Sequence, residues 1–175
     1  MNCKVYIATS IDGFIATKDG GVDWLMEIEN PNNDDFGFAD FIEGVDALVM
    51  GRNTFEKVLT FGDWVYSKPV YVLSSTLKSI PESLYGKAFL IGGDIKDVLH
   101  TLENKGLTNL YIDGGKVIQS FLELDLIDEM TITRIPRVLG EGIPLFESMS
   151  NCIKFSHVKT EVLLDELVKT HYKKV

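Results

Sequence analysis

Short apolar runs alternate with segments of helical period along most of this chain, and this alternation limits the folds that it can adopt. Between the runs, apolar residues recur with the spacing of a helix face, as Phe55, Val58 and Leu59 do. Strands that alternate with helices are typical of a mainly parallel, twisted sheet with helices on its faces, so the sequence predicts a three-layer α/β fold. The runs that we expect to be strands are CKVYIAT (3–9), DALVM (46–50), PVYVL (69–73), AFLI (88–91), NLYI (109–112) and IDEMTITR (127–134).

The C-terminal part of the chain has a different pattern. Residues 154–163 and 167–174 alternate in polarity around Asp165 and Glu166, which predicts an antiparallel hairpin at one edge of the sheet. A length of 175 residues, without a repeat or a clear linker, fits one domain over residues 1–175.

Charge and composition exclude several classes of function. Seventeen Lys and Arg against 26 Asp and Glu give a formal charge of -9, which disfavours a nucleic-acid partner but permits a phosphorylated small molecule in a local pocket. Two cysteines and three scattered histidines provide neither a disulfide framework nor a metal site. No run is apolar and long enough to span a membrane, and no secretory signal is evident, so we expect a cytoplasmic protein with reduced thiols.

Glycine pairs follow two of the expected strands. Gly92-Gly93 and Gly114-Gly115 each stand between a strand and a helix. Glycine allows close approach of the backbone to a ligand, and the N–H groups of a helix N-terminus bind anions. The alternative interpretation is a pair of tight turns, and neither pair forms a GxGxxG motif.

A third strand end carries a cation. Gly51 ends an apolar run, and Arg52 and Thr54 lie in the first turn of the helix that follows. A cation there is unfavourable with the helix dipole unless an anion is bound, although a surface arginine remains the alternative.

These segments together resemble the dihydrofolate reductase-like superfamily, closest to the branch of the riboflavin-biosynthesis reductase domain. The similar segments appear in family order and are ATSIDGFIA (8–16), VDWL (22–25), ALVMGRNTFE (47–56), VYVLSST (70–76), LYIDGGKVIQSFL (110–122) and IDEMTITRIPRVLGEGIPLF (127–146). The resemblance implies an NADPH cofactor, with Ala8 and Ile15 beside the nicotinamide and Gly51, Arg52 and Thr54 at the phosphates on the adenylate side. It places Leu73, Ser74 and Ser75 along the adenosine and its 2′-phosphate, Gly114, Gly115, Lys116 and Val117 at the pyrophosphate, and Gly92 and Gly93 nearby.

The substrate half departs from the folate enzymes. The acidic residue that those enzymes carry on their first helix has Asp35 as its ungapped counterpart, but the Leu-Pro that precedes it is missing from NPNNDDFGF. Asp35 beside Phe36 is our candidate proton donor, with a pKa raised by apolar neighbours, and helix capping is the alternative role. Trp24 and Phe36 are expected to line the substrate, although Trp24 could equally be a core residue.

The resemblance therefore predicts an NADPH-dependent reductase of a small, heteroaromatic, pterin- or pyrimidine-like substrate. The alternative is a protein of the same fold that binds a nucleotide- or pterin-like ligand without turnover. Relatives of this branch are often dimers, so a homodimer is expected. The HxE and PCxxC motifs of the zinc deaminase that accompanies this reductase are absent from the sequence.

Overall fold

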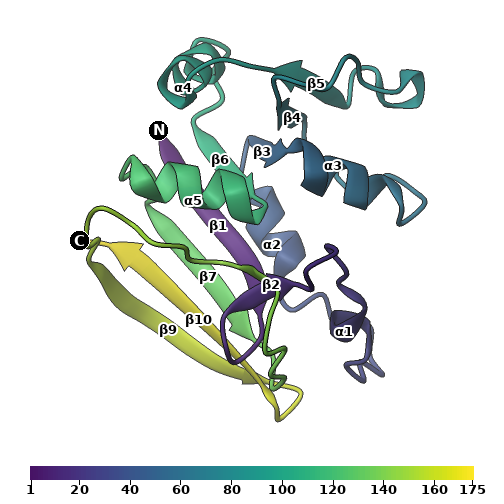
Figure 1. Ribbon diagram of the computed structural model, residues 1–175, viewed down its shortest axis with the longest axis vertical. Helices are drawn as coiled ribbons and strands as arrows, with labels where there is room; N and C mark the ends of the chain where they lie inside the picture. Colours follow the sequence, from purple (N-terminus) through teal and green to yellow (C-terminus); the bar gives the residue numbers. More distant parts are fainter.

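The computed structural model describes residues 1–175, and an eight-stranded sheet uses the chain from Asn2 to Lys174. The strand order is β5-β4-β3-β6-β1-β7-β10-β9 (Figure 1). A separate two-stranded sheet pairs β2 (Phe14–Ala16) with β8 (Ile143–Pro144). The strands of the large sheet are β1 (Asn2–Thr9), β3 (Ala47–Gly51), β4 (Val70–Leu73), β5 (Ala88–Ile91), β6 (Asn109–Asp113), β7 (Glu129–Arg134), β9 (Phe155–Leu163) and β10 (Leu167–Lys174).

The strands from β5 to β7 in this order all run parallel. β10 pairs antiparallel with β7, and β9 pairs antiparallel with β10 at the edge of the sheet. The predicted mainly parallel sheet with a C-terminal antiparallel hairpin is therefore confirmed.

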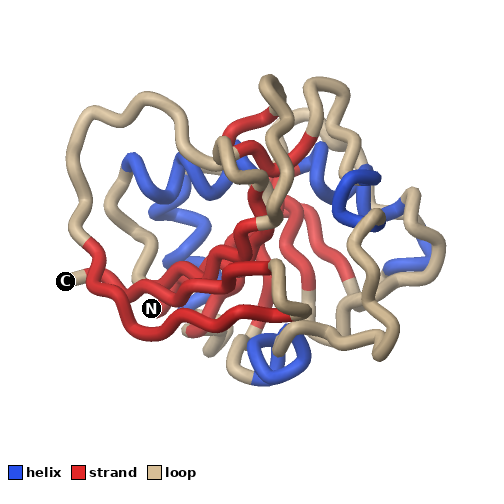
Figure 2. The backbone as a smooth tube through the Cα atoms, turned by 90° about the horizontal axis from the view of Figure 1, so that it is seen from below, coloured by secondary structure: helices blue, strands red, loops and turns tan.

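Helices cover both faces of the sheet, which gives the three predicted layers (Figure 2). Alternate residues of β6 enter different cores: Leu110 and Ile112 pack with α4 and α5, whereas Tyr111 packs with α2 and α3. Each core is apolar because period-two strands supply one residue in two to each face. The helices are α1 (Asp23–Met26), α2 (Phe38–Glu43), α3 (Arg52–Leu59), α4 (Ile95–Glu103), α5 (Gly115–Glu123) and the short 3₁₀ helix η1 (Glu82–Leu84).

The parallel arrangement brings the carboxyl ends of six strands to one edge of the sheet. The glycine-rich and hydroxyl-rich segments singled out in the sequence follow β3, β4, β5 and β6 at that edge. Ligands of open α/β sheets bind beyond these strand ends, so the fold gathers the predicted site there.

The composition of residues 3–9 predicts a strand buried on both faces, and the structure corrects this expectation. β1 is buried in its first half, at Cys3 and Val5, but Tyr6, Ile7 and Ala8 are only half-buried. Its last residue, Thr9, is buried again. The strands β2 and β8 and the helix α1 were not expected, because elements of two to four residues carry too little periodicity to be recognised.

Candidate active site

Two helix N-termini stand next to each other at the centre of the site. α3 follows β3 and α5 follows β6, and these two strands are neighbours in the sheet. No side chain caps either helix, and neither has an acidic residue in its first turn. By contrast, Asp94 caps α4 by accepting a hydrogen bond from the N–H of Lys96 (2.9 Å). The free N–H groups and the positive dipole ends of α3 and α5 therefore make a site suited to an anion.

The two helix starts are held in close contact by small residues. A Cβ on Gly114 would collide with the hydroxyl of Thr54, and a Cβ on Gly51 would lie 3.2 Å from Cγ2 of Val117. Gly114 also has a φ of +87°, which favours glycine. A Cβ on Gly115 would come within 2.9 Å of Cδ1 of Ile15 on β2, so the structure brings these six predicted residues together.

The segments predicted to hold the adenosine lie farther along the same edge. Leu73 ends β4, and the N–H of Ser74 donates to the carbonyl of Ile91 at the end of β5 (3.1 Å). The hydroxyl of Ser74 accepts from the N–H groups of Thr76 and Leu77 (3.1 and 3.0 Å) and so fixes this turn. Gly92 lies against the carbonyl of Ser74, whereas Gly93 and Ser75 border open space or solvent.

Both predicted cations already have carboxylate partners. Nε of Arg52 lies 2.7 Å from Glu56 one turn along α3, and its Nη1 donates to the hydroxyl of Thr76 (3.2 Å). The ammonium of Lys116 lies 3.1 Å from Glu147. Arg52 thus bridges α3 to the Ser74 turn.

On the other side of β1, three predicted residues form one apolar cluster. Trp24, Ala8 and Phe36 pack together around Ile135 and Leu167. Trp24 is only 7% exposed, and its indole Nε1 is buried without a hydrogen-bond partner. A buried donor without an acceptor is costly, which makes this N–H a candidate to donate to a ligand.

Asp35 occupies a capping position, and the expected rise of its pKa is wrong. Its carboxylate accepts from the N–H groups of Gly37 (2.9 Å) and Ala39 (2.8 Å) at the start of α2. These hydrogen bonds favour the charged form and lower the pKa of Asp35, since the side chain is exposed to solvent and burial opposes the effect only weakly. Local backbone donors thus outweigh the neighbouring Phe36 ring.

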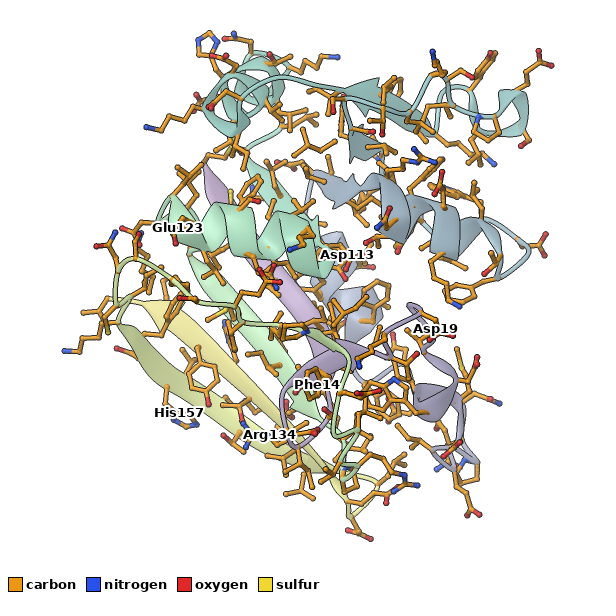
Figure 3. The ribbon with its side chains drawn as sticks, in the orientation of Figure 1. Phe14, Asp19, Asp113, Glu123, Arg134 and His157 are labelled. Atoms are coloured by element: carbon orange, nitrogen blue, oxygen red, sulfur yellow. The ribbon has the colours of Figure 1, made fainter.

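Asp113, which our sequence interpretation did not assign, has the properties expected of Asp35. It is the last residue of β6 and precedes the Gly114 turn, and Figure 3 shows it beside the N-terminal end of α5. Burial raises its pKa to about 6, although a hydrogen bond from the N–H of Gly114 (2.8 Å) opposes the shift. Its charge in turn adds to burial in raising the pKa of Tyr66. The available signal was an acid that directly continues an otherwise apolar strand.

A surface groove of about 420 Å³ extends from Lys116, a predicted site residue, along α5 past Gln119 and Phe146. No group of three His, Cys, Asp or Glu side chains is placed to hold a metal ion, and both cysteines are free. No helix has the length and apolar character needed to cross a bilayer.

Comparison with known proteins decides the family. The model of the RibD C-terminal domain matches residues 4–169. This chain belongs to the RibD C-terminal domain family. The uncharacterized protein YwjB of Bacillus subtilis (strain 168) is 37% identical over 171 residues, which cover 96% of this chain and 95% of YwjB.

Solved structures of RibD-like proteins agree with this assignment. A crystal structure from Shewanella sp. PV-4, named for riboflavin biosynthesis, is 51% identical, with a TM-score of 0.96 over 100% of this chain and 99% of that one. The bifunctional deaminase/5-amino-6-(5-phosphoribosylamino)uracil reductase of Thermotoga maritima matches with a TM-score of 0.74 and 17% identity, over 99% of this chain and 56% of that one. Dihydrofolate reductase from Enterococcus faecalis, complexed with NADP(H), matches with a TM-score of 0.68 and 16% identity, over 99% of this chain and 96% of that one. The RibD domain described here therefore has the dihydrofolate reductase-like fold that the sequence predicts.

Proposed function

We propose that this protein is an NADPH-dependent reductase of a small heteroaromatic substrate. The observation that carries the proposal is the pair of adjoining, uncapped N-termini of α3 and α5. Asp113, whose pKa is raised, immediately precedes α5, and the apolar cluster of Trp24 holds an unpaired indole N–H. The relatives named as reductases, and the E. faecalis neighbour complexed with NADP(H), support the same interpretation.

The order of the strands indicates which part of the cofactor would lie at which strand end along the edge of the sheet. Gly51, Arg52 and Thr54 on α3 and Gly114, Gly115, Lys116 and Val117 on α5 would hold the phosphates. Leu73, Ser74, Ser75, Gly92 and Gly93, after β4 and β5, would hold the adenosine with its 2′-phosphate. Ala8 and Ile15 would then lie at the nicotinamide, and Trp24 and Phe36 at the substrate.

The nicotinamide supplies a hydride when NADPH is bound, and the protein has to orient the substrate, exclude water and provide a proton. Asp113 fits the proton-donor role better than Asp35. Its pKa of about 6 leaves a useful protonated fraction near neutral pH, whereas the pKa of Asp35 is lowered. Trp24 can orient the substrate by donating its free N–H to a ring acceptor.

The test is NADPH oxidation with a panel of dihydropterins, dihydrofolate and aminouracil ribosides, together with calorimetry of NADPH binding. We expect tight NADPH binding and turnover with at least one heteroaromatic compound. Absence of NADPH binding would overturn the proposal. Binding without oxidation across the panel would favour the alternative, a ligand-binding protein without turnover.

We also propose that the protein is a cytoplasmic homodimer. β9 is a nine-residue strand at the free edge of the sheet, and its Val158 and Val162 are 52% and 64% exposed. Long exposed edges of this kind pair readily with another chain, and a second copy would cover both valines. Light scattering should give the mass of a dimer, and Val162→Lys should reduce it to that of a monomer.

A further inference from the structure

The segment that borders the substrate side carries acids only. Residues 19–46, which include α1 and α2, contain nine Asp and Glu residues and no Lys, Arg or His. The same segment supplies Trp24 and Phe36 to the apolar cluster around Ala8. A ligand at this cluster therefore lies next to a strongly negative stretch of chain; its acids are Asp19, Asp23, Glu27, Glu29, Asp34, Asp35, Asp40, Glu43 and Asp46.

The charges of three carboxylates act on a hydroxyl at the border of this cluster. The hydroxyl of Tyr6 donates to the carbonyl of Phe36 (2.6 Å), next to Asp34 and Asp35. Burial raises the pKa of Tyr6 to about 12, and the charges of Asp35, Glu161 and Asp34 add to this effect. The negative potential thus reaches the surroundings of Phe36 itself.

One cation reaches this place, and its ammonium already has polar partners. Lys169, on β10, has a side chain that is only 15% exposed. Its ammonium donates to the carbonyl of Phe36 (2.8 Å) and lies 3.2 Å from the carboxylate of Glu161 on β9. Glu161 also pairs with Lys159 (2.8 Å), and the contacts of Lys169 with Glu161 and with the Phe36 carbonyl fix the Phe36 turn.

The unpaired group in the cluster points to a neutral partner. Nε1 of Trp24 is a neutral donor without an acceptor, in a residue that is only 7% exposed. A carbonyl oxygen or a ring nitrogen of a heteroaromatic compound satisfies such a donor without bringing a charge into the acidic surroundings.

We infer that the substrate of this site is a neutral or cationic heteroaromatic compound without a phosphate group, and that the site discriminates against phosphorylated substrates. This inference rests on the proposed reductase function. It separates the protein from the T. maritima neighbour, whose name specifies a phosphoribosylamino substrate. Like charges across a site lower both the affinity and the rate of encounter of an anion, and salt screens this effect.

The test compares a matched pair, 5-amino-6-ribosylaminouracil and its 5′-phosphate, by calorimetry on the full-length protein saturated with NADP⁺. We expect the unphosphorylated compound to bind at least tenfold more tightly, with a difference that shrinks as KCl is raised. Equal or tighter binding of the phosphate, or binding of neither compound, overturns the inference. Failure of NADP⁺ and NADPH to bind, measured separately, would instead contradict the proposed function.

Two variants test the electrostatic origin of the discrimination. Glu161→Gln leaves Lys169 unbalanced, and Asp34→Asn removes a charge next to Phe36 while an amide oxygen can still accept from the Phe36 N–H. Each should lower the affinity ratio of the pair severalfold. Glu103→Gln, an exposed change at the end of α4, is the matched control and should leave the ratio unchanged. An unchanged ratio in both test variants would overturn the inference.

Discussion

Thr54, on α3, lies so close to Gly114, at the start of α5, that a side chain on Gly114 would collide with its hydroxyl and would lie 3.2 Å from its Cβ. The helix N-termini that we assign to the phosphates are therefore packed together through Thr54, with no room for a side chain on Gly114. This contact couples the cofactor site directly to the stability of the fold.

Replacement of Gly114 by Ala should destabilise the protein more than the same change at Gly93. Both glycines have a positive φ, +87° and +114°, so both variants carry the strain of the left-handed region, of order 1–3 kcal/mol. Only Gly114→Ala also meets a packed side chain, because nothing lies within 4 Å of a Cβ on Gly93. We expect an additional loss of about 1–3 kcal/mol in urea unfolding. Equal losses would show that the Thr54 contact is unimportant.

Removal of the carboxylate that holds Arg52 should strengthen NADPH binding relative to NADH. Arg52 pairs with Glu56 at 2.7 Å, so Glu56→Gln should free its guanidinium for a 2′-phosphate. Arg52→Ala should remove much of the preference for NADPH, since a charged hydrogen bond contributes about 1.5–3 kcal/mol. Calorimetry with both cofactors measures each change. If neither variant changes the ratio of the NADPH and NADH affinities, the assignment of Arg52 to the 2′-phosphate is wrong.

The sequence was sufficient for the elements whose periodicity extends over a whole strand or helix. Runs such as DALVM and PVYVL, buried on both faces, and the Gly51 and Gly114 turns that follow β3 and β6, could be placed because each depends on local residue types. The strands β2 and β8 could not be predicted in this way. Their pairing joins residues about 130 positions apart and involves only two or three residues in each strand.

The two aspartates show where sequence reasoning about a site stops. Asp35 could be placed beside Phe36, but its pKa depends on the N–H groups of Gly37 and Ala39, which point at it only once α2 has formed. The pKa of Asp113 is raised by the desolvation that the folded protein imposes, and spacing along the chain does not show this burial.

Replacement of Asp35 by Asn should separate capping from catalysis. The carboxylate accepts two backbone hydrogen bonds through its two oxygens, whereas an amide offers one acceptor, so we expect a stability loss of about 0.5–1 kcal/mol. Turnover should remain within a few-fold of the native rate across pH, because the lowered pKa makes Asp35 a poor proton donor. A loss of about 10²-fold in hydride transfer with intact folding would restore Asp35 as the proton donor.

Replacement of Asp113 by Asn should stabilise the protein at neutral pH while it impairs catalysis. The pKa of Asp113 is raised from 3.8 to about 6 in the folded protein, so between these values the folded state binds more protons than the unfolded state. Its contribution to stability is therefore greatest below about pH 4 and falls as pH rises to 6, by up to about 3 kcal/mol at 1.36 kcal/mol per pKa unit. In chemical unfolding from pH 4 to 8, the free energy of unfolding of Asp113→Asn should rise relative to that of the native protein as the pH increases. Asp46→Asn is a control of opposite sign, because hydrogen bonds from Asn109 and Thr108 lower the pKa of Asp46 and stabilise its charged form.

If Asp113 donates the proton, the native rate should fall as pH rises above 6, and the Asn variant should lose about 10²-fold in rate together with that pH dependence. A variant that keeps both the native stability profile and the native rate profile would show that Asp113 is neither desolvated nor catalytic.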